Sequence, residues 1–185
     1  LSNVIKLSRN KILYSSHHLS HCLYGSLYVD NIYDYAYVSC DGVGEGETMT
    51  IYTIENENLI KKYWTNFYPN SIGLFYSAIT DFLGFDINDG EFKVMSLSSY
   101  GNPIFEKEMD EIFDYEQLKI NLSYFEFHKN PERSFSEKLI KILGKPYLNL
   151  NIKENFEKYS NIASSAQLIL NKSVKNLILK AKQPT

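Results

Sequence analysis

Cysteine is scarce in this sequence, and long apolar runs do not occur. Only Cys22 and Cys40 are found among 185 residues, which is too few for a disulfide framework. We therefore expect two reduced thiols in a cytoplasmic protein rather than a disulfide-stabilised secreted protein. No segment approaches the ~18 consecutive apolar residues from which a membrane-spanning helix is predicted, so the sequence indicates no membrane partner.

An excess of positive charge is also missing. The chain has 19 basic against 22 acidic side chains, for a formal net charge of −3, whereas a protein that binds nucleic acid electrostatically needs a basic face. The charge balance therefore argues against a nucleic-acid partner. The length suits one domain with its own core, but the first residue is Leu1 rather than Met, and we expect part of a longer protein.

Segments of strand and helix character alternate along the chain. Strands are indicated by short apolar or alternating runs, and helices by apolar residues at helical spacing, with Ser71 and Gly84 as the ends of one helix. We expect strands over residues 11–15, 33–40, 48–54 and 59–67, an extended segment over 118–127, and helices over 17–28, 72–83, 104–113, 135–143 and 156–182. This order predicts an α/β fold, in which a mixed sheet has helices on at least one face.

Three of the four histidines fall within five residues, because residues 17–21 read HHLSH. His17 and His21 are four apart, so on a helix both imidazoles project from one face, with their Cβ atoms about 5–6 Å apart. This is the spacing by which a helix offers two nitrogen ligands to one metal ion. The alternative is that the histidines cap and satisfy the start of a helix, and the residues alone leave both interpretations open.

An aspartate and a glycine-rich segment follow the expected strand 33–40. Asp41 could join the histidine pair in a site of two histidines and one carboxylate, which suits Fe, Mn or Zn; alternatively, it caps the next turn. Residues 42–46 read GVGEG, and glycines allow successive N–H groups to converge on a phosphate. A glycine-rich hairpin is the other explanation of that segment.

Four motifs, in order, resemble those of the NodU-type O-carbamoyltransferase family. Residues 17–22 (HHLSHC) are similar to the HHLAHA signature, and residues 41–45 (DGVGE) to the DGxG(D/E) loop. Residues 71–85 resemble the SLGxxYxxxTxxLGF helix, and residues 90–101 (GEFKVMSLSSYG) match GEYKVMGLAPYG at most positions. The closing helix also fits this family.

The resemblance implies a fold and an activity. The chain would be an internal fragment, residues 1–185, of the N-terminal catalytic domain, which has an actin-like ATPase (ribonuclease H-like) fold. Residues 103–150 match no motif and are expected to be a variable insertion. Further parts of the fold would flank the chain, and a carbamoyl-adenylate-forming domain would follow it. The implied reaction moves a carbamoyl group from carbamoyl adenylate, made from carbamoyl phosphate and ATP, to a hydroxyl of a sugar or other small molecule. The fragment alone is expected to be inactive.

The resemblance also implies roles for individual residues. The chemistry also needs an acceptor for the proton of the substrate hydroxyl. One candidate is His18, rotated about 100° from the histidine pair on a helix, and a metal-bound oxygen is another; in the second case His18 supports or packs beside the pair. Lys93 is a candidate for the nucleotide phosphates, or else pairs with a carboxylate. The expected ligands of a divalent metal are His17, His21 and Asp41, and the expected nucleotide-binding residues are Gly42, Gly44, Glu91 and Lys93.

Two alternative functions are considered. The first is threonylcarbamoyl transfer to tRNA, by enzymes that share the actin-like fold, although the acidic balance does not favour an RNA partner. The second is a nucleotide-binding module without catalytic activity. The presence of candidate ligands at all three metal positions argues against such a module.

Overall fold

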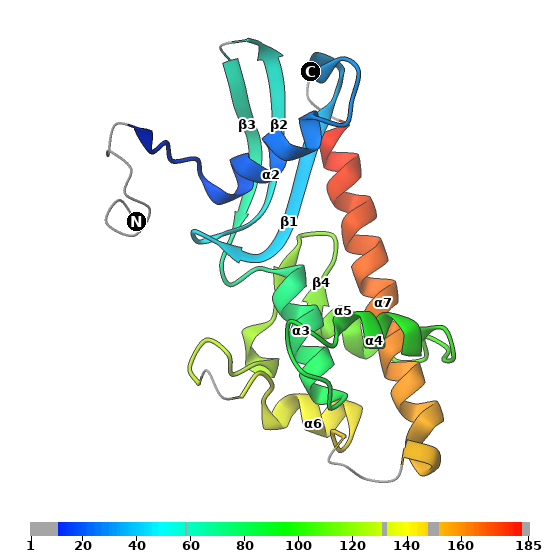
Figure 1. The fold of residues 1–185 in the computed structure, drawn as a ribbon. Coiled ribbons are helices and arrows are strands. Elements are labelled where there is room, and N and C mark those ends of the chain that lie inside the picture. The colour runs from blue at the N-terminus through cyan, green and yellow to red at the C-terminus, as the bar shows by residue number, and fades with distance from the viewer. Residues whose placement is uncertain (1–10, 58, 131–132, 148–151, 183–185) are drawn as a thin grey trace.

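The computed structural model describes residues 11–57, 59–130, 133–147 and 152–182. Figure 1 shows a three-stranded sheet with one short helix lying across it, a group of helices below the sheet, and one long helix that runs along both. The strands are β1 (Ala36–Gly44), β2 (Glu47–Asn56), β3 (Leu59–Phe67), β4 (Phe113–Asp114) and β5 (Lys119–Ile120). The helices are α2 (His17–Ser26), α3 (Ile72–Phe82), α4 (Glu91–Ser98), α5 (Glu106–Ile112), α6 (Glu137–Leu143) and α7 (Ile152–Ala181), with 3₁₀ turns at Ile32–Asp34 and Leu122–Tyr124.

The main sheet is an antiparallel meander in the order β1-β2-β3. Val38 pairs with Ile51, which in turn pairs with Trp64. The expected strands over residues 48–54 and 59–67 and the hairpin between β2 and β3 are confirmed. The strand expected over 33–40 begins only at Ala36, and Ile32–Asp34 form a 3₁₀ turn instead. The expectation of a mixed sheet is wrong for the described residues, because every strand pair among them is antiparallel.

Two local expectations also differ from the structure. Residues 12–15, where a strand is expected, form none. Residues 41–44 belong to β1 rather than to a loop after it, and the chain reverses at Glu45 and Gly46, whose φ angles are 54° and 90°. The glycines do not end the strand: the pairing with β2 is interrupted after Cys40 by an irregularity of the register and resumes between Gly44 and Glu47.

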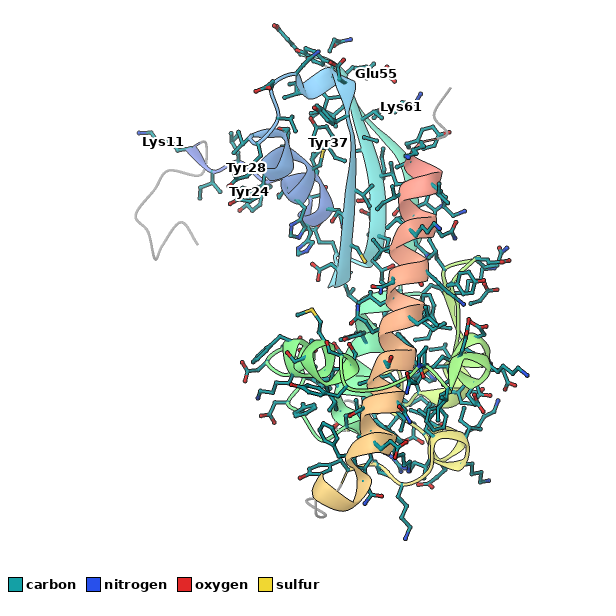
Figure 2. The ribbon with its side chains drawn as sticks, turned by 90° about the vertical axis from the view of Figure 1, so that its right-hand side faces the viewer. Lys11, Tyr24, Tyr28, Tyr37, Glu55 and Lys61 are labelled. Carbon is teal, nitrogen blue, oxygen red and sulfur yellow. The ribbon has the colours of Figure 1, made fainter. Side chains whose placement is uncertain are left out.

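The two faces of the sheet are covered by different helices. In Figure 2, α2 lies on one side of the sheet and α7 on the other. A small core of Cys22, Tyr37, Tyr52 and Ile54 fills the space beneath α2. Tyr37 donates its hydroxyl to the carbonyl of Ile32 at 2.8 Å, so its polar end is satisfied at the edge of this core.

The main core lies between the sheet, α3 and α7. The predicted helix α3 is confirmed: Ser71 caps it by accepting a hydrogen bond from the Leu74 N–H at 3.0 Å, and Gly84 follows its end with a φ of 78°. The predicted helices at α5 and α6 are also confirmed, while the expected extended segment forms β5, a 3₁₀ turn and an isolated β-bridge between Phe125 and Phe135. Residues 103–150 contribute several fully buried side chains to this core, namely Met109, Ile112, Phe113, Leu118, Phe125 and Leu139.

The long helix α7 confirms the predicted closing helix and packs closely against the chain after α4. Gly101 lies so near α7 that a Cβ atom there would be 2.1 Å from the Ser160 carbonyl oxygen. Asn161 and Ser165 of α7 accept hydrogen bonds from the N–H groups of Asn102 and Phe105, at 2.7 and 3.1 Å. Among the described residues, no helix is long and apolar enough to span a bilayer.

This close approach predicts the effect of adding one methyl group. Gly101→Ala places its Cβ against backbone atoms of α7 that cannot rotate away, and should lower the free energy of unfolding by about 1–3 kcal/mol. Urea denaturation measures the change. Gly25→Ala is the matched control, because its Cβ meets Tyr37 at an ordinary 3.7 Å inside α2, and it should be neutral or slightly stabilising. Equal stability of the two variants would contradict the proposed packing.

Candidate metal and ligand site

The first turn of α2 carries the histidines and is held by the β1–β2 turn. The backbone N–H of His17 donates to the Glu45 carboxylate at 3.1 Å. The preceding residue, Ser16, makes no side-chain cap. A carboxylate from another element thus supplies the anionic partner that a helix N-terminus favours, and it fixes where α2 begins relative to the strand.

His17, His21 and Asp41 form a compact cluster, as predicted from the sequence. Nε2 of His17 lies 2.6 Å from Oδ2 of Asp41, and Nε2 of His21 lies 3.5 Å from the same oxygen. The two Nε2 atoms are 3.1 Å apart. The ligand atoms all lie within 4.8 Å of one another, so helix spacing and strand position have brought two imidazoles and one carboxylate to one point.

Close backbone contacts determine the position of Asp41. The Ser71 hydroxyl donates to the Asp41 carbonyl at 3.1 Å. A Cβ on Gly73 would lie 2.9 Å from the Gly42 backbone and 3.0 Å from the Asp41 carbonyl, so the start of α3 meets the strand there at its closest. A Cβ on Gly44 would lie 2.1 Å from the His17 ring. The absence of a side chain at Gly73 therefore makes room for the backbone of Asp41 and Gly42, and its absence at Gly44 makes room for the His17 ring.

The Asp41 carboxylate is stabilised in its charged form. Burial raises the pKa of Asp41, but the hydrogen bonds from His17 and from the Gly42 N–H outweigh it, so the pKa lies below its ordinary value. The Gly42 bond to Oδ1 is 2.6 Å long and leaves Oδ2 directed at the histidines. At neutral pH the cluster therefore presents a negative carboxylate between two imidazoles, a donor set that suits a divalent cation.

His18 lies behind this cluster rather than in it. Its ring has no exposed surface, and Nδ1 is 2.7 Å from the Ser39 hydroxyl. The ring centroid is 5.3 Å from that of His17. A group with no exposed surface does not touch a substrate directly, which favours the alternative that His18 supports the histidine pair.

A cavity of about 350 Å³ opens beside Asp41. It is bounded by β1, the start of α3 and the turn before α4. The Cβ position of Gly42 faces open space, so a ligand could approach this backbone closely. The lining residues are Cys40, Asp41, Gly42, Ile72, Gly73, Tyr76, Ser77, Asn88, Glu91 and Leu170.

Glu91 lies at this cavity in a network of donors. Its Oε1 accepts hydrogen bonds from the Ser77 hydroxyl at 2.7 Å and from the Asn88 N–H at 3.0 Å. Burial raises the pKa of Glu91, but these hydrogen bonds outweigh it and lower the pKa below the ordinary value. Burial, together with the nearby charge of Glu91, raises the pKa of Tyr76 to about 12. Glu91 is therefore a fixed anion at the cavity wall.

The structure brings two of the four predicted nucleotide-binding residues to this cavity and leaves two outside its lining. Gly42 and Glu91 line it. Gly44 is buried beneath the His17 ring, and the Lys93 ammonium lies 5.6 Å from the centre of the Phe92 ring. Ser77 and Asn88, which bind the Glu91 carboxylate, were not predicted as site residues. Ser77 lies within the motif of residues 71–85, and Asn88 lies shortly before the motif of residues 90–101.

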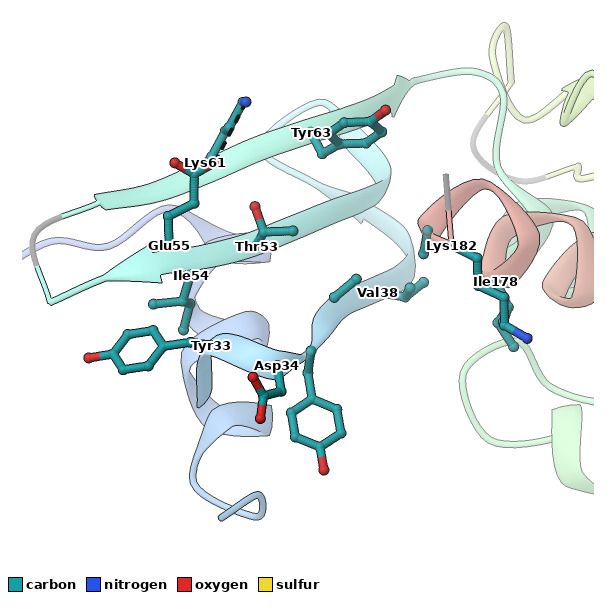
Figure 3. A pocket seen from close by; sticks show the side chains of 13 residues that line it. Tyr33, Asp34, Val38, Thr53, Ile54, Glu55, Lys61, Tyr63, Ile178 and Lys182 are labelled. Carbon is teal, nitrogen blue, oxygen red and sulfur yellow. Dashed lines mark ion pairs between the residues drawn. The ribbon is translucent and has the colours of Figure 1, made fainter. Parts of the chain in front are cut away.

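A second, larger cavity of about 920 Å³ lies between the sheet and the C-terminal end of α7. Figure 3 shows it between the strands and the last turns of α7, with Val38 and Ile178 among its apolar walls and the Glu55–Lys61 ion pair at its rim. It contains none of the predicted site residues. The smaller cavity, which shares Asp41 with the cluster, is therefore the candidate ligand site.

Comparisons with known proteins agree with the motifs. The carbamoyltransferase N-terminus family matches residues 1–182. An uncharacterized protein of Synechocystis is 30% identical over 171 residues, which cover 90% of this chain and 27% of the relative. An uncharacterized protein of Methanocaldococcus jannaschii is 32% identical over 178 residues, which cover 92% of this chain and 30% of the relative. The chain thus spans less than a third of the length of these relatives.

The network around Glu91 predicts a pH-dependent contribution to stability. Because the pKa of Glu91 is lowered by folding, its contribution is present above about pH 4.3, the ordinary glutamate value, and is lost as pH falls through the lower value of the folded state. Glu91→Gln should cost about 1 kcal/mol at pH 7, the scale of a charged hydrogen bond discounted for solvent exposure.

Thermal unfolding from pH 7 down to pH 3 tests this dependence. The difference between the natural protein and Glu91→Gln should shrink as the pH is lowered. Glu157→Gln, at an exposed position of α7, is the control and should change stability little at any pH. A Glu91→Gln deficit that stays constant down to pH 3 would contradict the assignment.

Proposed function

This chain belongs to the carbamoyltransferase N-terminus family, and we propose that it supplies the metal and nucleotide contacts of an enzyme that transfers carbamoyl groups. The donor is carbamoyl adenylate, made from carbamoyl phosphate and ATP, and the acceptor is a hydroxyl of a sugar or another small molecule. The observation that carries the proposal is the cluster of His17, His21 and Asp41, which shares Asp41 with a ligand-sized cavity.

The donor set of the cluster fits a divalent cation such as Fe, Zn or Mn. Two imidazole nitrogens and one ionised carboxylate converge on one point, and this combination leaves other positions of the cation open to a substrate. His17, His21 and Asp41 would hold the cation. When bound, it supplies a positive charge that polarises the carbamoyl carbonyl.

The cavity walls fit the other half of the donor. Gly42 leaves open backbone beside the metal ligands, where a phosphate can approach the chain without meeting a side chain. Glu91 offers a fixed carboxylate on the opposite wall, which can accept hydrogen bonds from hydroxyl groups such as those of a ribose. We propose that the nucleotide lies between these two residues.

The proposed transfer forms one bond and breaks one bond at the carbamoyl carbon. The acceptor oxygen forms a bond to the carbamoyl carbon, the bond from that carbon to the phosphate oxygen breaks, and AMP leaves with the electron pair. The hydroxyl proton passes to a base at the open side of the cluster. His18 does not reach that side, because its ring is completely buried, and we propose that it supports the histidine pair.

We expect the reaction to occur in the cytoplasm, where ATP and carbamoyl phosphate are available.

Metal analysis tests the cluster directly. The full-length protein should bind one divalent cation, and His17→Ala combined with His21→Ala should abolish this binding, because two of three ligands are lost. Elemental analysis after dialysis measures the occupancy. His128→Ala is the control: it removes the one histidine that lies outside residues 17–21 and is not part of the cluster, and it should retain the cation. Full occupancy in the double variant would refute the assignment.

Carbamoyl transfer tests the activity. With ¹⁴C-labelled carbamoyl phosphate, ATP and a panel of sugars, the full-length protein should release AMP and label a sugar. Asp41→Asn should slow labelling by about 10²-fold or more, because a charge at the reacting centre is removed. Glu157→Gln should behave as the natural protein. Tight binding of tRNA at physiological salt would favour threonylcarbamoyl transfer instead, and an absence of AMP release with every acceptor would favour a non-catalytic module.

A further inference from the structure

A second contact between α2 and β1 lies beneath the metal-ligand cluster. Nδ1 of His18 is 2.7 Å from Oγ of Ser39, and the two residues are only 0% and 6% exposed. Ser39 precedes Asp41 by two residues, so both side chains project from the same face of the strand. The buried contact therefore joins the same helix and the same strand as the cluster does.

The cluster cannot maintain its own geometry once a cation is bound. The 2.6 Å contact between His17 and Asp41 joins Nε2 to Oδ2, and these are the atoms that the cation would need. The bond between His18 and Ser39 uses none of the ligand atoms. It can hold α2 against β1 both with and without a cation.

Packing alone does not explain a histidine at position 18. Its Nε2 atom is buried and has no hydrogen-bond partner in the described part of the chain, and an unpaired buried polar atom reduces stability. An apolar side chain of similar size would fill the same space without that loss. The feature that an apolar side chain could not provide is the hydrogen bond to Ser39.

We infer that Ser39 is a positioning residue for the metal site. Its hydroxyl holds the His18 ring, and through it fixes the rotation of α2 about its axis, so that His17 and His21 face Asp41. The inference rests on the proposed function, because it concerns the same cluster. Ser39 would thus orient the metal ligands without binding the metal itself, as residues around a metal site commonly do.

Cobalt binding to the full-length protein tests this inference. Ser39→Ala should weaken Co²⁺ binding by about 10- to 100-fold, the usual effect of losing such a partner, and should alter the visible absorption of the bound Co²⁺. Ser39→Thr keeps the hydroxyl and suits a strand, so it should restore both the affinity and the spectrum. Calorimetric titration and absorption spectroscopy provide the two measurements.

Thr50→Val is the matched control. Thr50 is the cross-strand partner of Ser39, is fully buried, and its hydroxyl has no partner within the described residues. Its removal should leave Co²⁺ binding unchanged. If Ser39→Ala fails to fold, Ser39→Cys replaces the hydroxyl with a weaker hydrogen-bonding thiol of similar shape and should weaken Co²⁺ binding in the same direction.

The outcomes separate this inference from the proposed function. Natural Co²⁺ affinity in Ser39→Ala, or equal losses in Ser39→Ala and Thr50→Val, would overturn the positioning role and leave the metal site standing. If the natural protein binds Co²⁺ no more tightly than the double variant of His17 and His21, both the metal site and the positioning role are refuted.

Discussion

The start of α2 lies against the last residues of β1 at a distance that only glycine allows. The His17 ring occupies the space where a side chain of Gly44 would be, while Glu45, the next residue, accepts a hydrogen bond from the His17 N–H. One turn of chain thus both makes room for the helix and fixes its first residue. The metal-ligand cluster depends on this contact, because it places both imidazoles over Asp41.

A charged carboxylate that is partly buried must be stabilised by its neighbours. Asp41 obtains this stabilisation from the Gly42 N–H and from His17, so the hydrogen bonds outweigh the effect of burial on its pKa. The arrangement is open to solvent, since the side chains of His17 and Asp41 are 40% and 38% exposed. The cluster is thus charged and accessible, and the buried bond between His18 and Ser39 lies beneath it.

The ligand cavity depends on packing far from the cluster. Its walls come from β1, α3, the turn before α4 and Leu170 of α7. The helix α7 can pack this closely because Gly101 has no side chain where it meets the backbone of α7. Residues 103–150, which match no motif, bury Met109, Phe113 and Leu139 in the same core. The segment that was least informative in the sequence therefore supports the elements that carry the most recognisable motifs.

The sequence by itself determined the composition of the cluster and most of the helices. The i, i+4 spacing of His17 and His21 and the apolar periodicity of α3 and α7 are local patterns, and local hydrogen bonding is sufficient to express them. Only the tertiary structure decided that every strand pair among the described residues is antiparallel, where β1 ends and how each glycine of the motif is used. Gly42 faces open space and Gly44 lies beneath a histidine ring, although both occur in one short motif. That difference depends on which element packs against β1, and so does the burial of His18 against Ser39. These contacts join residues that are far apart in the sequence, so the spacing of residues within one motif does not predict them.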